Sequence, residues 1–538
     1  MVLPAVRSIA WKNWFMQGFE RMDRQLADAG ALAGHLVPAG SMFAFLAEHR
    51  AEVFPDEDYA DLFAPPGKGR PSIPVTQMAA VLTLQAVHGY SDRETAEAVR
   101  FDVRWKAAVG AALDDPGFDP STLVYWRRRL AASERPHRVG DAVRKVVEET
   151  GILRGRRRRA AGSTILDDAV ATQDTVTQLV SAIRRAAREV PGAAAVIAAQ
   201  CTGHDYSQPG KPQADRDDPA AKDALVPSLV NDAGKVLAAF AGADLDEAAA
   251  AALALLALVA GQDVEPAEGS DGRDGRWRIA CKVAEDRVIS TVDPQARHTR
   301  KSSSSRRDGY RAHLAADPET GIITGEKLTM AAGEENTDAA VAAEFAEAGS
   351  GDAEGPLNWY GDSAYGTGEL RAALAAAGQR AVIKPKPVLP AVPGGFTADD
   401  FTVDHDAGTV TCPAGVTRQV TARNAVIFGT ACRDCPLRQQ CTTAKDGRTI
   451  RLHQHDALLR AARAEWAALR DDYKTHRPNV ERAVAQVTAR RGLRLKLRYR
   501  GVTPNDAWLR HRTAALNLRN LISRGLTRHD GSWTLAPA

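Results

Sequence analysis

The amino-acid sequence predicts an α/β protein: a mixed sheet flanked by helices, with a helical N-terminal part and a small cysteine-containing β insertion. Helical apolar spacing dominates up to about residue 152. Between residues 281 and 390, strand-like and helical segments then alternate, as in a mixed sheet covered by helices. Four cysteines gather in a Thr- and Val-rich stretch at residues 401–455, which indicates a separate small module.

Composition places the chain among soluble globular proteins but reveals strong local charge. The 538 residues are enough for about three domains, and 25% charged with 44% hydrophobic residues is ordinary. The net charge of +3 conceals basic clusters at 154–159, at 297–311 and from Arg490 onward. From Arg490 to Arg528 there are eleven Arg or Lys residues and one acid, Asp506. Such local fields suit a polyanion better than a small substrate.

Neither a signal peptide nor a membrane span is evident. The longest apolar run, Ala248 to Ala260, is about five residues short of a membrane span. Six cysteines are too few for a disulfide scaffold in a chain of this length. We therefore expect a cytoplasmic protein without a membrane partner.

The N-terminal segment, residues 1–152, is predicted to be a helical DNA-binding domain. Helices are expected at 41–53, 74–88, 92–100 and 120–130. The second and third are separated by His88-Gly-Tyr90, the outline of a helix-turn-helix, although any antiparallel helix pair looks the same. Arg127, Arg128 and Arg129 stand beside aromatic residues, which fits phosphate contact.

The middle of the chain is predicted to contain the core of the sheet, interrupted by a helical insertion. Residues 153–200 begin the core, residues 201–280 form the insertion between polar linkers, and residues 281–390 continue the core. The core elements expected here are strands at 309–316, 321–329 and 380–384, and helices at 175–189 and 338–348.

Asp362 is the first candidate site residue. It follows the apolar segment Leu357 to Tyr360, stands beside Gly361, and precedes a helix expected from Glu369 to Ala377. A carboxylate at the end of a strand is well placed to hold a hard cation such as magnesium. The alternative is that Asp362 only caps the loop or the helix.

The cysteine-rich insertion, residues 391–455, is a candidate metal module. Cys412, Cys432, Cys435 and Cys441 give the spacing C-x19-C-x2-C-x5-C. Four cysteines of this kind suit a tetrahedral zinc site, but the spacing is not that of a standard finger. Reduced thiols packed inside a small β module remain the alternative.

Glu481 is the second candidate acid, in the segment 456–538 that ends the core and forms a basic tail. A long helix at 456–472 leads to Tyr473, and Pro478 stands near the start of the next helix. Arg477 precedes Glu481 by four residues, the spacing of a helical ion pair. An isolated Glu in this position is usually a dipole or salt-bridge partner.

Several motifs together resemble one family. They are Ser121-Thr-Leu with Arg127-Arg-Arg129, Leu166-Asp-Asp through Gln178, Lys301-Ser-Ser-Ser-Ser through Tyr310, Gly361-Asp-Ser-Ala-Tyr-Gly366, Cys432-Arg-Asp-Cys435 with Cys441, and Tyr473 through Glu481. Over nearly its whole length the chain resembles a bacterial insertion-sequence transposase of the DDE class, most closely the long group named for insertion sequence 1182.

The resemblance implies a ribonuclease-H-like core in which two Asp and one Glu bind two divalent ions, Mg or Mn. One ion activates the attacking oxygen and the other stabilises the leaving 3′ oxygen. Asp362 would be the second acid and Glu481 the third, with Arg477 orienting Glu481 or a phosphate and Tyr473 near the DNA. Thr488 stands where the family has a lysine, and Arg490 or Arg491 would substitute for it. The partners implied are double-stranded DNA, as transposon ends and target, and a second copy of the chain in a nucleoid-associated homodimer.

The first acid is where the sequence departs from the family. The family carries Asp-Ser-Thr or Asp-Gly-Thr on its first core strand, and the matching stretch here is Gly162-Ser163-Thr164. Asp167 and Asp168 lie five and six residues further on, too far along a strand to take the same place. Losing this carboxylate weakens transition-state stabilisation.

Four functions therefore remain open. They are a DDE transposase, inactivated or not at Gly162; a catalytically silent, transposase-derived DNA-binding protein; a metal-dependent nuclease using Asp362, Glu481 and either Asp167 or Asp168; and a helical scaffold that binds nucleic acid non-specifically.

Overall fold

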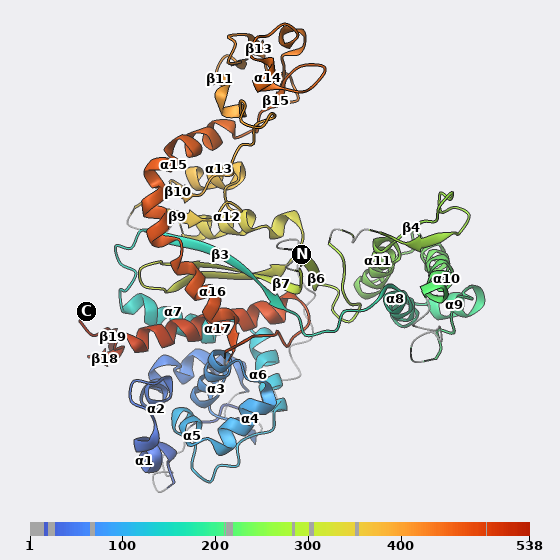
Figure 1. The fold of residues 1–538 in the computed structure, drawn as a ribbon. Helices are drawn as coiled ribbons and strands as arrows, with labels where there is room; N and C mark the ends of the chain where they lie inside the picture. Colours follow the sequence, from blue (N-terminus) through green and yellow to red (C-terminus); the bar gives the residue numbers. More distant parts are fainter. Residues whose placement is uncertain are drawn as a thin grey trace.

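The fold is drawn from a computed structural model that describes residues 15–19, 27–64, 70–208, 210, 219–281, 284, 286–300, 306–349, 355–490 and 492–537. Four parts are visible in Figure 1: a helical N-terminal part, a central sheet, a helical bundle beside the sheet and a cysteine-containing module at the far end. The expected motif segment 301–305 and Arg491 lie outside the described residues.

The N-terminal part is mostly helical. The helices expected at 41–53, 74–88, 92–100 and 120–130 are present. In order the helices are α1 (Ala29–Ala33), α2 (Met42–Val53), α3 (Val75–His88), α4 (Asp92–Phe101), α5 (Val103–Val109), α6 (Ser121–Ala131) and α7 (Arg138–Glu149). A short parallel pair, β1 (Phe15–Met16) with β2 (Arg70–Pro71), accompanies them. Helix α4 begins with a capping box, in which the Ser91 hydroxyl accepts from the Glu94 amide and the Glu94 carboxylate accepts from the Ser91 amide.

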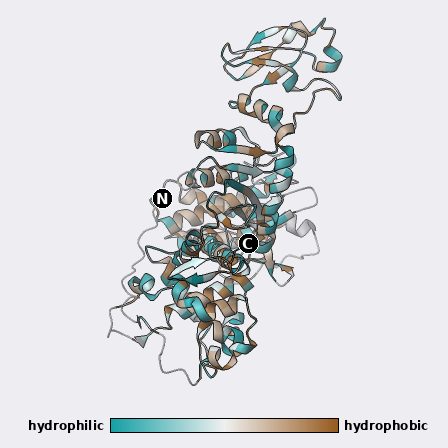
Figure 2. Cartoon of the chain, turned by 90° about the vertical axis from the view of Figure 1, so that its left-hand side faces the viewer, coloured by the Kyte–Doolittle hydropathy of each residue, from teal (hydrophilic) through white to brown (hydrophobic). Residues whose placement is uncertain are grey.

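These helices do not close a core by themselves. Leu518 and Leu521 of the late helix α17 (Val502–Ser523) are buried in the same apolar cluster as Leu46 of α2 and Leu84 of α3. Apolar residues therefore concentrate where the N-terminal helices meet α17. Figure 2 shows hydrophobic residues, in brown, distributed along the helices and strands of the chain. The N-terminal part and the end of the chain are stabilised by one shared core.

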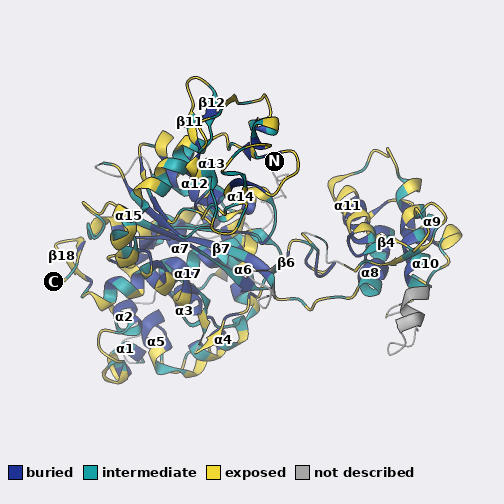
Figure 3. Ribbon diagram, turned by 45° about the horizontal axis from the view of Figure 1, so that its top comes forward, coloured by how far each residue is buried: buried dark blue, intermediate teal, exposed yellow. Residues whose placement is uncertain are grey.

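The central sheet is mixed and has the strand order β10-β9-β3-β7-β6, with β8 also paired to β7. Its strands are β3 (Arg158–Asp167), β6 (Arg297–Arg300), β7 (Arg306–Ala316), β8 (Ile323–Met330), β9 (Asn358–Gly361) and β10 (Arg380–Ile383). Strands β3, β7 and β8 form an antiparallel meander, and β9 and β10 run parallel to β3. Figure 3 shows these strands buried at the centre of the molecule.

Helices cover both faces of the sheet because alternate residues along its strands are apolar on both sides. Ala161 of β3 and Trp359 of β9 pack on the face covered by α12 (Asp338–Ala348) and α13 (Gly368–Ala376). Ala160 and Tyr360 pack on the opposite face, under α16 (Asn479–Thr488) and α17. Residues at even positions of β3 therefore face α16.

The helical bundle interrupts the sheet between β3 and β6. It contains α8 (Thr175–Glu189), α9 (Ala193–Gln200), α10 (Pro219–Ala239) and α11 (Glu247–Gln262), with a small hairpin of β4 (Val264–Pro266) and β5 (Trp277–Ile279). Helices α8 and α9 share the buried core of α10 and α11, so this packing unit begins before residue 201.

The cysteine-containing module and two long helices complete the chain. The module consists of β11 (Thr402–Asp404), β12 (Thr409–Thr411), β13 (Thr417–Gln419), β14 (Ala425–Ile427), α14 (Arg438–Cys441) and β15 (Thr449–Arg451). Helix α15 (Asp456–His476) leads from it back to the sheet, where α16, the hairpin of β16 (Ala489–Arg490) and β17 (Leu493–Arg494), α17 and a last hairpin of β18 (Thr527–His529) and β19 (Ser532–Thr534) follow. None of the helices in the described residues is long and apolar enough to cross a membrane.

Candidate functional site

Asp362 stands where β9 ends and a tight turn begins. Its Oδ1 accepts a hydrogen bond from the Ala364 amide at 2.8 Å, and its backbone carbonyl accepts from the Tyr365 amide at 3.1 Å. The preceding Gly361 is required for close approach, because a Cβ there would lie 2.7 Å from the Cβ of Tyr365. The turn leaves the Asp362 side chain half exposed, at 50%.

Helices α15 and α16 bring Glu481 to the same place. Arg477, which is buried at the junction of the two helices, donates from Nη1 to Glu481 Oε1 at 2.9 Å and from Nη2 to Asp362 Oδ2 at 3.3 Å. The guanidinium group therefore joins the two carboxylates across 119 residues of sequence, the difference between positions 481 and 362. Glu481 itself remains exposed.

Tyr473 lies beside this cluster, one turn before Arg477 on α15. Burial raises the pKa of its hydroxyl, and the charge of Arg477 lowers it, while those of Asp362 and Glu481 raise it further. Its ring packs edge-on against Trp466 at 5.0 Å between centroids. Four predicted site residues, Asp362, Tyr473, Arg477 and Glu481, are thus brought together.

Gly162 of β3 lies against α16, the helix that carries Glu481. The parallel pairing of β3 and β9 ends where Ala160 is opposite Tyr360, two residues before Gly162 on one strand and two before Asp362 on the other. A Cβ at Gly162 would lie 3.2 Å and 3.3 Å from the two methyl groups of Val480 and 3.3 Å from one of Val484. The position expected for the first acid therefore faces α16 beside Glu481, and it carries no side chain.

Asp167 and Asp168 do not join this cluster. They lie at the other end of β3, roughly 16 Å from Gly162 along an extended strand. Asp167 forms ion pairs with Arg307 at 3.2 Å and with Arg494 at 3.3 Å. Asp168 is 4% exposed and accepts from the Val170 amide at 2.7 Å, and burial raises its pKa.

Most of the arginines predicted to contact DNA have partners within the protein. Arg127 forms an ion pair with Asp92 at 2.5 Å and lies over the Tyr499 ring, and Arg129 lies over the rings of Phe63 and Trp126. Arg128 between them is exposed.

Arg490 of the basic tail forms an ion pair with Glu94 of α4. These arginine contacts tie α6 and the β16–β17 hairpin to α4. Among the arginines predicted to contact DNA in the described part of the chain, Arg128 is therefore the one that faces solvent and forms no such contact with another side chain.

Sequence reasoning missed the role of Arg512. This residue belongs to the basic run after Arg490, but its side chain is buried under α3 and α16. Its burial could have been predicted from helical spacing, because position 512 lies on the same face of α17 as Leu509 and Leu516, which are also buried.

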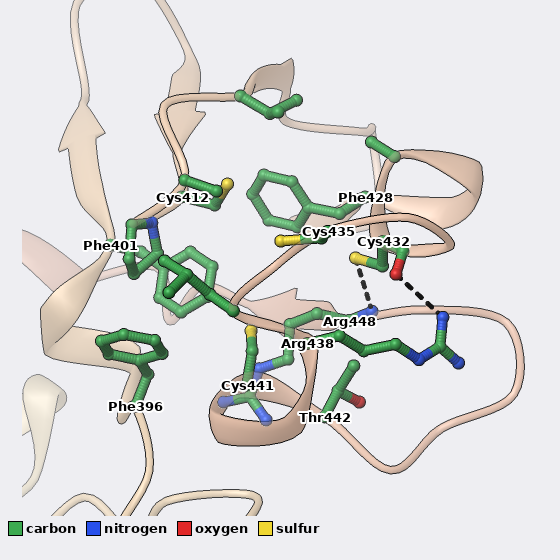
Figure 4. Close-up of a pocket in the computed structure, with 15 residues that line it drawn as sticks. Phe396, Phe401, Cys412, Phe428, Cys432, Cys435, Arg438, Cys441, Thr442 and Arg448 are labelled. Carbon is green, nitrogen blue, oxygen red and sulfur yellow. Dashed lines mark hydrogen bonds between the residues drawn. The ribbon is translucent and has the colours of Figure 1, made fainter.

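The four cysteines of the module face one small cavity (Figure 4). The cavity measures about 20 Å³, which is room for one water-sized sphere, and its walls include Phe396, Phe401 and Phe428. The Arg448 amide donates to Cys432 Sγ at 3.4 Å, and burial and the other three cysteines raise the pKa of the Cys441 thiol.

Neither the acidic cluster nor the cysteine module, as the structure describes them, has side chains placed to hold a metal ion. Among the described residues, no three His, Cys, Asp or Glu side chains are placed so that they could hold a metal ion. At the acidic cluster a guanidinium stands between two carboxylates and the third carboxylate is missing, so these residues do not fit two divalent ions. In the cysteine module the number and type of donors suit zinc but their placement does not, and zinc stays a prediction from the spacing.

Comparison with known proteins identifies two segments. Residues 411–522, which include Glu481, match a family model described as a transposase DDE domain. Residues 33–129 match one described as a transposase domain (DUF772). No curated protein and no solved structure matches the chain. The two matches support a DNA transposase function of the insertion-sequence type.

Proposed function

We propose that this protein is a DNA-binding transposase of the DDE type whose strand-cleaving site is inactive for lack of the first acid. One observation carries the proposal: Gly162, two residues beyond the pairing of β3 with β9, faces the helix of Glu481 and has no side chain. The two transposase matches support action on DNA. The strand order, with an antiparallel meander followed by two strands parallel to its first, supports a ribonuclease-H-like core.

The residues that remain at the site support binding rather than bond cleavage. Arg477 neutralises part of the charge on Asp362 and Glu481, and this lowers the electrostatic cost of bringing a phosphate close to them. Removal of one stabilising group from a pre-organised site typically costs a factor of about 10² to 10³ in rate. We propose that the partner is double-stranded DNA at the ends of the element, held by a homodimer of the insertion sequence 1182 type.

Replacing Gly162 with Asp is expected to restore cleavage only if α16 has room for the new side chain. A Cβ at this position already meets Val480 at 3.2 Å, so Gly162→Asp alone is strained. The double variant Gly162→Asp/Val480→Ala removes the two crowding methyl groups of Val480 and leaves the one of Val484 at 3.3 Å. We expect it to cut a labelled duplex of the DNA flanking its own reading frame at least about 100-fold faster than the unaltered protein.

The control is Gly162→Ala/Val480→Ala, which opens the same space without a carboxylate and should not cut. Adding Asp362→Ala to the active double variant should abolish cleavage. All proteins are assayed with magnesium or manganese, and end binding is measured in parallel. Cleavage by the unaltered protein that disappears in Asp362→Ala would refute the proposal. Loss of that cleavage in Asp167→Asn or Asp168→Asn would instead identify a metal-dependent nuclease.

A further inference from the structure

A basic groove lies next to the acidic cluster, on the neighbouring face of α16. It has a volume of about 400 Å³, in the range of pockets that hold ligands. Its walls come from α16, from the end of α17 and from the turn between β7 and β8. Helices α16 and α17 lie side by side on one face of the sheet (Figure 1).

Three arginines from two helix ends face this groove without acidic partners. Arg482, Arg519 and Arg524 line it, and none of them forms an ion pair among the described residues. Arg519 donates to Gln486 Oε1 at 3.3 Å, and Arg524 donates to the Thr320 carbonyl at 2.8 Å. Arg482 is exposed and, in the described chain, has no side-chain hydrogen bond.

The one acid at the groove is already neutralised. Glu319 forms ion pairs with Arg156 and Arg158, which precede and begin β3. The groove therefore carries an excess of positive charge that nothing within the described protein balances. Its floor is apolar, since Ala483 and Leu516 are both buried.

We propose that this groove binds the sugar-phosphate backbone of a DNA strand that runs toward the Asp362–Glu481 cluster. Arginine donors in the walls match phosphate oxygens, and an apolar floor tolerates the sugar. Arg482 follows Glu481 directly on α16, so a strand held here lies next to the acidic cluster. This inference rests on the proposed function, because it names the surface that would hold the DNA.

The test is DNA affinity of the full chain with Arg482→Gln/Arg519→Gln. The matched control is Arg423→Gln/Arg433→Gln, which removes the same charge from exposed positions of the cysteine module. Dissociation constants for the flanking-end duplex are measured by fluorescence anisotropy across a range of salt concentrations. We expect the groove variant to bind about tenfold or more weakly at 0.15 M salt than the control, with a salt slope smaller by about two.

A second variant, Arg482→Glu, keeps the test valid if the double variant is poorly folded, since this side chain is exposed and makes no bond in the described protein. It should weaken binding more than Arg433→Glu. Equal affinities for groove and control variants would overturn the groove inference while leaving end binding intact. If the unaltered protein itself binds its flanking ends no better than an unrelated duplex, the proposed function fails instead.

Discussion

Replacing Arg512 with Met is expected to lower the free energy of unfolding by about 4 kcal/mol, because it leaves several buried carbonyl groups without donors. The Arg512 side chain is 1% exposed, and all five of its N–H donors are used. Nε donates to the Val487 carbonyl at 2.8 Å and Nη2 donates to those of Gln486, at 2.8 Å, and Ala489. Nη1 donates to the carbonyls of Ala86 and Val87.

The five carbonyls belong to the C-terminal ends of two helices. Ala86 and Val87 lie in the last turn of α3, Gln486 and Val487 lie in the last turn of α16, and Ala489 directly follows α16. The last carbonyls of a helix have no partners within it and carry the negative end of its dipole, so one guanidinium satisfies both ends at once. Burial lowers the pKa of Arg512 to about 10, which leaves it charged at neutral pH. Arg512 thereby fixes the helix that carries Glu481 to the N-terminal helices.

Urea unfolding measures this effect. Arg512→Lys keeps the charge but has three donors in place of five, so its loss should be intermediate. Arg519→Met, seven residues later on the same helix and exposed, should change stability by less than about 0.5 kcal/mol. A loss for Arg512→Met no larger than that of Arg519→Met would contradict this role.

The elements near the site could be predicted because their signals are local. Gly361 marks the turn at Asp362, and this turn is found as expected. The spacing of Arg477 and Glu481 predicts their ion pair, which forms at 2.9 Å. The spacing does not predict the second hydrogen bond of Arg477, to Asp362, because that bond depends on how α15 crosses the edge of the sheet.

The fate of the basic residues could not be predicted, because sequence shows charge but not direction. Arg127, Arg128 and Arg129 are consecutive, yet Arg127 pairs with Asp92, Arg129 covers Phe63, and Arg128 faces solvent. A helix turns about 100° per residue, so neighbours on α6 necessarily have different surroundings. Arg512 and Arg519 differ in the same way on α17, where one is buried as a helix cap and the other is exposed.

The stability of the interface between the N-terminal helices and the sheet is expected to depend on pH through Glu326. This residue of β8 is packed under α7 and α17, and burial raises the pKa of its carboxyl to about 7. Arg510 at 3.8 Å and Arg144 at 4.0 Å lower that pKa, while Asp506 raises it. Both arginine contacts are too long to offset the desolvation of the carboxylate.

The sign follows from proton binding. Between pH 4.5 and 7 the folded protein keeps the proton on Glu326 and the unfolded chain loses it, so the contribution of this residue to stability falls as pH rises. Above pH 7 the deficit is constant, at about 3 kcal/mol from the difference between the two pKa values. Replacing Glu326 with Gln removes this loss of stability. The variant should therefore be more stable than the unaltered protein at pH 8 by up to about 3 kcal/mol, and nearly equal at pH 4.5.

The difference between the two proteins, measured by urea unfolding at both pH values, isolates Glu326 from other titrating groups. This matters because burial lowers the pKa of His511 on α17 to about 4, and a buried neutral histidine makes stability fall toward acid pH, in the opposite sense. Glu148→Gln, at an exposed position of α7, is the control and should give a difference that changes little with pH. A Glu326→Gln difference that is the same at pH 4.5 and pH 8 would show that Glu326 ionises as readily in the folded protein as in the unfolded chain. The arginines of α7 and α17 would then compensate its burial.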